Sequence, residues 1–373
     1  MIRKRLEHRL KRMGLLVLSR LAPKVRPGPT PVDLERVARI LVVKPDERIG
    51  NAILVTPLLV ALKGRFSRAH LVLLLGRRFW ELHEHLPSAD EFIAFEKSRY
   101  ARRPFGFLSL VRRLRDRDFD LVFDTAGDHE VSFTHIALTA LSGGQFRIGH
   151  ARGDAAQFYE VAVPVPARTR HAAEMHLDLL RAVTPIRSHP RPLLRPHPDS
   201  GFAERFVGEC DWNPALPLVV IHPGARGPKQ WPPEEFARVV ELLQSQSRVN
   251  IALVWGPADG EAAQTVLCAT NVRPAGILSF ADFLSLARRA SVFLSGDCGP
   301  MHLAAAAGAP VVAIFLASDP EKYRPLGLGD VTLDGRVQPV EPGAVVVAIL
   351  GLITRQQAVR QSELPFAETG RAS

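Results

Sequence analysis

The sequence has few cysteines, few aromatic residues and no apolar run long enough to span a membrane. Its cysteines are odd in number and far apart, which argues against a disulfide framework or a cysteine-ligated metal site: Cys210, Cys268 and Cys298. Unpaired cysteines are typical of a reducing compartment. The apolar stretch 14–19 is too short for a membrane span or a signal peptide and ends at Arg20. We therefore expect a cytoplasmic protein.

Acidic residues are also in the minority. The chain has 38 Asp and Glu against 48 Lys and Arg, which gives a formal net charge of +10. This excess favours an anionic partner, such as a nucleic acid, an anionic membrane surface or a phosphorylated substrate. The sequence has no zinc-finger or basic-zipper pattern and no basic run with interleaved aromatics, so we expect no nucleic-acid partner.

The length of 373 residues favours two domains. Composition predicts a basic amphipathic helix with a Pro-rich linker (1–30), an N-terminal domain (31–195), a C-terminal domain (196–355) and a polar tail (356–373). In the first helix, apolar residues recur every three or four positions: Ile2, Leu6, Leu10, Met13, Val17 and Leu21. Two interpretations stay open: the helix lies on an anionic bilayer, or it packs on the protein with a solvated basic face.

Strands and helices alternate along both predicted domains, which indicates βαβ units and parallel sheets. The predicted strands are 39–44, 71–75, 91–95, 121–124, 218–222, 250–255, 292–295 and 311–315. The predicted helices are 51–66, 108–117, 129–141, 234–246, 261–269, 281–289, 301–307 and 343–354. The predicted fold is therefore α/β, with two Rossmann-like, doubly wound domains that face a cleft. Such sheets bind ligands outside the carboxyl ends of their strands.

Segment 295–310 is the most informative motif, because it follows a predicted strand and opens a helix. Gly296 and Gly299 let the backbone pass close to a ligand, and the free N–H groups of the helix start form an anion site. Asp297 stands beside that site, and His302 lies on the first turn. The alternative is an ordinary strand–helix turn that Asp297 caps.

Segment 222–236 has the same plan of strand end, glycine-containing loop and helix start. Its loop contains Gly224, Ala225, Arg226 and Lys229. The two cations are suited to neutralising a diphosphate leaving group, although a merely solvated basic loop remains the alternative.

The loop 254–261 follows the next strand. Gly256 at the strand end and Glu261 form a pattern that suits the hydroxyl groups of a ribose. An exposed acid stabilised by the dipole of the following helix explains Glu261 nearly as well.

Two loops of the N-terminal domain complete the candidate site. The first, 44–57, contains Asp46, Glu47, Gly50 and Asn51. A direct transfer to a hydroxyl acceptor needs a base that takes the proton of that hydroxyl, and a carboxylate in this loop would suit that role. The second loop, 124–128, contains Asp124 and Gly127 and is placed to line the acceptor side.

Together these segments resemble glycosyltransferase family 9, the ADP-heptose:lipopolysaccharide heptosyltransferases, over about residues 38–335. The most specific match is Gly296–His302 with the Ala-rich helix that follows. Ser or Thr is common in the family where this chain has Cys298. Residues 229–232 are similar to the family's Lys/Arg-x-Trp-Pro segment.

The resemblance implies a GT-B architecture with the donor nucleotide mainly on the C-terminal domain and the acceptor mainly on the N-terminal one. It implies metal-independent, cofactor-free and inverting transfer of a heptose from an ADP-sugar. The implied acceptor is an anionic, lipid-linked glycan of the lipopolysaccharide core, which would place the protein at the inner face of the cytoplasmic membrane.

One residue departs from the family pattern. The first loop of the family usually reads Gly-Asp, and that Asp is the proposed base, whereas this chain has Gly50 and Asn51. An amide is not a useful base near neutral pH. Three accounts remain: Asp46 or Glu47 serves as the base, Asn51 only orients the acceptor, or the chain binds without turnover. Another donor sugar or surface-glycan acceptor, and a non-catalytic sugar-nucleotide or glycan binder, are the alternative functions.

Overall fold

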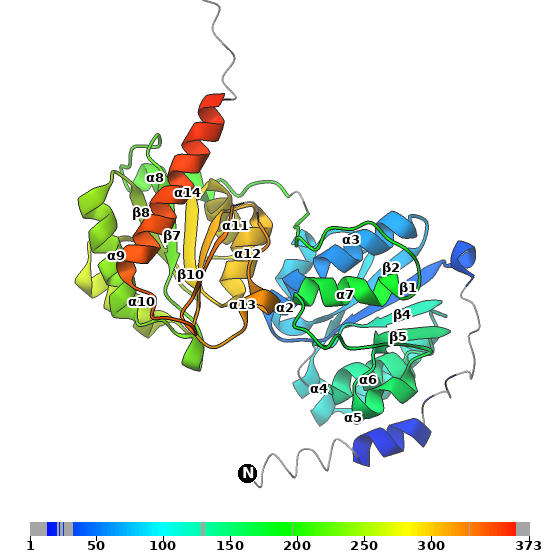
Figure 1. The fold of residues 1–373 in the computed structure, drawn as a ribbon. Helices are drawn as coiled ribbons and strands as arrows, with labels where there is room; N and C mark the ends of the chain where they lie inside the picture. Colours follow the sequence, from blue (N-terminus) through cyan, green and yellow to red (C-terminus); the bar gives the residue numbers. More distant parts are fainter. Residues whose placement is uncertain are drawn as a thin grey trace, which may run out of the picture. The chain divides into compact units, whose positions relative to one another are not determined.

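The computed structural model describes residues 13–20, 22, 25, 33–127, 131–195, 197–327 and 329–362. The chain divides into two compact units, Met1–His197 and Pro198–Ser373, and each is an α/β unit built on its own sheet (Figure 1).

The N-terminal unit contains a six-stranded parallel sheet in the order β3-β2-β1-β4-β5-β6. The strands are β1 (Arg39–Lys44), β2 (His70–Gly76), β3 (Glu91–Phe95), β4 (Leu121–Asp124), β5 (Phe146–His150) and β6 (Val161–Val163). The central strands are buried along nearly their whole length, as expected when helices cover both faces. The sequence did not predict β5 and β6, because β5 mixes Arg and His with apolar residues and β6 has only three residues.

Helices cover both faces of this sheet. On one face, α3 (Thr56–Arg65) packs against α7 (Ala172–Arg181), and α5 (Pro104–Arg115) and α6 (Phe133–Leu141) cover the other face (Figure 1). Shorter helices join these elements: η1 (Leu34–Arg36), α2 (Ile49–Leu54), η2 (Arg77–His85), α4 (Lys97–Arg102) and η3 (Gly153–Phe158).

The single helix predicted at 51–66 is wrong, because the chain forms α2 and α3 with a break at Val55. Pro57 has no N–H group and cannot continue the hydrogen-bond ladder back to Ile53. The Thr56 hydroxyl donates to the Ile53 carbonyl instead, at 2.8 Å.

Residues 13–20 are helical, and this helix packs on the N-terminal unit through Leu15 and Leu18. Both side chains contact the cluster formed by α6 and η3. Met13 and Val17, which were expected on the apolar stripe, are 61% and 55% exposed. The buried face is therefore different from the predicted one, and the other residues of the predicted stripe lie outside the described residues.

The C-terminal unit has a second six-stranded parallel sheet, in the order β12-β11-β10-β7-β8-β9. The strands are β7 (Leu218–His222), β8 (Asn250–Val254), β9 (Arg273–Gly276), β10 (Val292–Gly296), β11 (Val311–Phe315) and β12 (Val331–Asp334). The edge strands β9 and β12 were not predicted from the sequence, because they are short and lack a buried apolar run.

The helices of this unit also form two layers. Side chains of α9 (Pro233–Gln246), α10 (Gly260–Ala269) and α14 (Pro342–Ser362) form one core with the sheet. Those of α8 (Phe202–Glu209), α11 (Phe280–Arg289) and α12 (Gly299–Ala307) form the other. Two short helices, η4 (Gly227–Lys229) and α13 (Pro320–Tyr323), lie in loops. The predicted tail is corrected in part, since α14 continues to Ser362. Within the described part of the chain, no helix is both long and apolar enough to cross a membrane.

Candidate functional site

Each unit has a cluster of polar residues at the carboxyl ends of two neighbouring strands. The strand order reverses between β1 and β4 in the N-terminal unit, and between β7 and β10 in the C-terminal unit. Doubly wound folds bind their ligands at such a reversal, because the two loops leave toward opposite faces of the sheet. In the C-terminal unit His222 and Ser295 are paired in register, so both predicted donor loops begin side by side.

The loop after β7 is held in shape by one side chain, Gln230. Its amide oxygen accepts from the backbone N–H of Ala225 at 2.7 Å. Its amide nitrogen donates to the carbonyls of Pro223 at 2.6 Å and Trp231 at 3.0 Å. Trp231 is buried and contacts Phe236 edge-on at the start of α9. The predicted donor loop is therefore anchored at both ends.

A charged pair joins this loop to the one after β10. The ammonium of Lys229 donates to the carboxylate of Asp297 at 2.5 Å, and the Ser318 hydroxyl donates to the same oxygen. Asp297 is buried, whereas the Lys229 side chain is 37% exposed, so the ammonium keeps access to solvent. Arg226 is exposed and makes no ion pair with another described residue. Of the two predicted cations, Lys229 is thus fixed by a buried carboxylate, and Arg226 is exposed without an ion pair to another described residue.

Asp259, which the sequence did not single out, connects the loops after β7 and β8. Its carboxylate accepts from the N–H of Gly256 at 3.2 Å. A Cβ at Gly224 would lie only 2.2 Å from the Asp259 carboxyl carbon, so glycine is required for this approach. Glu261, the predicted ribose ligand, is exposed on the first turn of α10. Its proposed role stays a prediction.

Three further predicted residues surround the start of α12. Gly299 begins the helix, and Cys298 is its N-cap without a capping side-chain bond. The thiol of Cys298 lies 3.8 Å from Nδ1 of His222, and burial raises its pKa to about 12, so it remains neutral. Burial also lowers the pKa of His222. His302 is buried within the helix. This part of the site therefore combines the neutral Cys298 thiol with helix-start N–H groups that can bind an anion.

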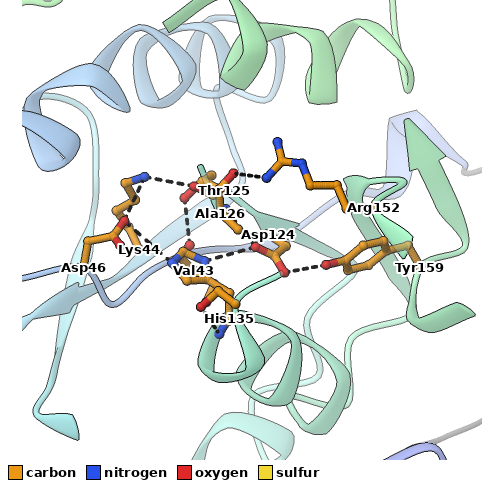
Figure 2. Close-up of polar contacts among 10 residues, drawn as sticks. Val43, Lys44, Asp46, Asp124, Thr125, Ala126, His135, Arg152 and Tyr159 are labelled. Carbon is orange, nitrogen blue, oxygen red and sulfur yellow. Dashed lines mark hydrogen bonds and ion pairs between the residues drawn. The ribbon is translucent and has the colours of Figure 1, made fainter. Parts of the chain in front are cut away.

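In the N-terminal unit a buried lysine connects the two loops at the reversal of strand order between β1 and β4 (Figure 2). Lys44 is 1% exposed and ends β1. Its ammonium donates to the Thr125 carbonyl at 2.9 Å and forms an ion pair with Asp46 at 3.0 Å. The Thr125 hydroxyl in turn donates to the Val43 carbonyl. A buried charge needs such partners, so the loops after β1 and β4 are tied together.

His135 on α6 lies between two carboxylates. Its Nδ1 is 3.0 Å from Asp124 and its Nε2 is 3.6 Å from Asp46 (Figure 2). Burial alone would lower the pKa of His135, but the two carboxylates raise it to about 9. The imidazole is therefore protonated at neutral pH.

The same contacts act on Asp46. Burial alone would raise the pKa of its carboxyl group, but Lys44 and the charged His135 outweigh burial and hold that pKa well below its ordinary value. Asp46 is thus a firmly ionised carboxylate and a weak base.

Asp124 is buried and has its own set of partners. It accepts from the Tyr159 hydroxyl at 2.6 Å and the Ala126 N–H at 2.9 Å, besides its contact with His135. Burial alone would raise the pKa of Asp124, but these hydrogen bonds and the charge of His135 lower it. A cavity of about 10 Å³ beside it has room for about one water. Asp124 therefore fixes His135, and its expected role in lining the acceptor side stays a prediction.

The other N-terminal residues expected at the site lie at the same strand ends. Glu47 is exposed in the loop between β1 and α2, and Asn51 is half-buried on α2. Neither side chain bonds to another described residue. Gly50 is buried beside Asn51, and Gly127 is exposed after β4.

A close approach of two loops positions Asp46. Gly76 ends β2, and a Cβ built there would lie 2.2 Å from the carbonyl oxygen of Asp46. Only glycine lets the backbone after β1 pass at this distance. Gly76 and His135 were missed from the sequence because the residues that they contact in the loop after β1 lie far away in the chain. Asp259 and Gln230 were not singled out, although their hydrogen-bond partners lie within seven residues.

Among the described residues, no group of three or more His, Cys, Asp or Glu is placed to hold a metal ion.

The sequence of this chain is similar to that of one known family of enzymes. The profile of glycosyltransferase family 9 (heptosyltransferase) matches residues 107–338, which is more than half of the chain. Lipopolysaccharide heptosyltransferase 3 of Escherichia coli is 24% identical over 289 residues, covering 74% of this chain and 83% of that protein. Lipopolysaccharide heptosyltransferase 2 of Salmonella typhimurium is 24% identical over 303 residues, covering 77% and 85%.

Solved structures agree at the level of the fold. A glycosyl transferase family 9 protein from Veillonella parvula superposes with a TM-score of 0.73 at 20% identity, covering 86% of this chain and 98% of that one. The E. coli ADP-heptose lps heptosyltransferase II has a TM-score of 0.69 at 19% identity, covering 86% and 99%. The two doubly wound sheets thus form the expected GT-B architecture.

Proposed function

Because this chain belongs to glycosyltransferase family 9, we propose that it moves a heptose, or a related sugar, from an ADP-sugar to a lipopolysaccharide-core or similar surface-glycan acceptor. The relatives named as lipopolysaccharide heptosyltransferases support the transferred sugar and the acceptor class, and the E. coli ADP-heptose lps heptosyltransferase II supports the ADP-sugar donor. The net charge of +10 suits an anionic acceptor and a place at the inner face of the cytoplasmic membrane.

The donor side of this proposal depends on one observation. Lys229 and Asp297 form an ion pair where the strand order reverses between β7 and β10. The buried carboxylate holds the ammonium in place, and a lysine has three N–H donors, so two remain for phosphate oxygens. Arg226 and the N–H groups at the start of α12 add positive potential. As the sugar leaves, these groups stabilise the negative charge that develops on the diphosphate.

The proposed transfer is a single displacement with inversion and uses neither a metal ion nor another cofactor. The acceptor hydroxyl oxygen forms a bond to the anomeric carbon while the bond from that carbon to the diphosphate oxygen breaks. The electron pair of the broken bond leaves with ADP. The hydroxyl proton passes to a base, which a carboxylate near the acceptor can supply.

Of the two carboxylates in the first loop, we assign the proton to Glu47. Asp46 is already paired with Lys44 and His135, which stabilise its ionised form and weaken it as a base. Glu47 is exposed and is not engaged by any described residue. In this proposal Asn51 orients the acceptor hydroxyl, and Asp46 keeps the loop in place.

Release of ADP tests this function. Purified protein would be mixed with ADP-heptose and truncated lipopolysaccharide acceptors, and donor binding would be followed by calorimetry. We expect acceptor-dependent release, and Glu47→Gln should reduce turnover by about a hundredfold with donor binding retained. Donor binding without ADP release in the presence of any acceptor would instead support a protein that binds the sugar nucleotide without transfer. The amide of Asn51, which cannot act as the base, would then explain the missing turnover.

The matched variant is Asp46→Asn, which removes the neighbouring carboxylate. We expect it to lower stability more than Glu47→Gln does, because it leaves Lys44 buried without its counter-charge. A folded Asp46→Asn protein with abolished turnover, beside a fully active Glu47→Gln protein, would reverse the assignment of the base.

A further inference from the structure

The outer surface of helix α5 has exposed apolar side chains that do not pack against the rest of the N-terminal unit. Its inner side packs into the core through Leu110 and Leu114. On the outer side Phe105 is 84% exposed and Leu108 is 60% exposed, and Arg112 follows on the same stripe. Helical periodicity places these three residues on one face, where a solvated helix would have polar side chains.

The charged residues within α4 and α5 all have the same sign. Between Lys97 and Arg115 the sequence has seven basic residues and no acidic one. All seven are exposed, and none of them forms an ion pair within the described part of the chain. We call the residues Arg99, Arg102, Phe105, Leu108 and Arg112 the α4–α5 face.

The N-terminal helix belongs to the same layer. It packs on α6 through Leu15 and Leu18, and α5 packs on α6 from its own core. Its outer side exposes Leu16 at 65%, next to Met13 and Val17. Figure 1 shows this helix, α4 and α5 on the same side of the N-terminal sheet.

We propose that the α4–α5 face docks on an anionic lipid bilayer, with Phe105 and Leu108 entering the headgroup region and the arginines binding lipid phosphates. Arginine binds phosphate through several N–H groups at once, and a basic helix with an aromatic and an aliphatic anchor is typical of interfacial binding. The core of a protein interface, in contrast, is depleted of charge. The inference deepens the proposed function, since a lipid-linked acceptor brings the enzyme to such a surface.

Vesicle co-sedimentation of the full chain tests the proposal without donor or acceptor, so its failure is separate from a failure of transferase activity. The vesicles contain phosphatidylcholine alone or with phosphatidylglycerol. We expect binding only to the anionic vesicles, and Phe105→Ser with Leu108→Ser should weaken it about tenfold or more. Arg102→Gln should weaken it by roughly fivefold at low salt.

The matched control replaces two exposed valines of the C-terminal unit, Val337→Ser with Val347→Ser, which are 82% and 73% exposed. We expect this control to bind like the wild type. Unchanged vesicle binding after the Phe105/Leu108 substitutions, or an equal loss in the control, overturns the proposal. If those substitutions instead abolish self-association in analytical ultracentrifugation and leave vesicle binding intact, the face is an interface between two copies and the proposal is also wrong.

Discussion

Replacement of His135 by Gln should remove a defined part of the pH dependence of stability. The folded-state pKa of His135 is about 9, against an ordinary value of 6.5. The folded N-terminal unit therefore holds a proton that the unfolded chain releases as the pH rises. The stabilisation is fully present below pH 6.5 and is lost as the pH rises through 9. The difference of about 2.5 pKa units corresponds to about 3 kcal/mol in the free energy of unfolding.

The neighbouring groups titrate outside this window. Asp46 and Asp124 have lowered pKa values, so their effects lie at acidic pH. The buried His150 and His176 also have lowered pKa values, and their effects lie below pH 6.5. Burial, reinforced by Asp124, raises the pKa of Tyr159 above its ordinary value, which moves its effect to strongly alkaline pH. Of these groups, only His135 has a raised pKa whose effect falls between pH 6.5 and 9.

Hydrogen exchange of peptides from β1 and β4, corrected for the intrinsic rate at each pH, would follow the N-terminal unit alone. The wild-type protein should lose about 3 kcal/mol of protection between pH 6.5 and 9, whereas His135→Gln should start lower and remain nearly flat. His189→Gln is the control, because this exposed histidine has no carboxylate partner among the described residues. Equal slopes in the wild type and in His135→Gln would refute the ionised triad of His135 with two carboxylates.

Three shorter predictions concern the positions of the site residues. Lys229→Ala should weaken ADP binding by calorimetry roughly tenfold, the low end for a charge-assisted contact because the side chain is partly exposed, and wild-type affinity would exclude its role. Gly76→Ala should displace the Asp46 backbone and cost about 1–3 kcal/mol of unfolding free energy, whereas Gly64→Ala, with open space around it, should not destabilise the protein. Asn51→Asp should restore at least tenfold of the ADP release lost in Glu47→Gln, and no gain would show that position 51 cannot take the proton.

The sequence predicted the central strands well, because each is a buried apolar run that ends in a polar loop. Strands β1, β4, β7 and β11 begin and end where the sequence placed them. The edge strand β3 was also predicted with its observed bounds. Strands β5, β6, β9 and β12 were missed, since a short strand such as β9 contains Pro and few apolar residues. Periodicity also missed the break between α2 and α3, where one proline matters more than the apolar pattern.

The candidate site was predictable only as a set of loops. Reversal of strand order explains why the loops containing Lys229 and Asp297 meet, and both loops were chosen from their glycines and charges. Spacing along the chain does not reveal which side chains bond. Lys44 bonds to Thr125, which lies 81 positions away, and its ion pair with Asp46 makes that carboxylate its counter-ion.

Each of the two clusters is held by contacts within its own unit, and this separates their expected roles. Lys229 is fixed by Asp297, which also accepts from Ser318, and all three lie in the C-terminal unit, so the loss of Lys229 should appear as weaker donor binding. Glu47 belongs to the N-terminal unit, so its loss should reduce turnover while the donor dissociation constant stays constant. Substitutions without shared partners add in free energy. The double variant should therefore show the sum of the two effects, and a large departure from additivity would mean that the donor and acceptor clusters act as one unit during transfer.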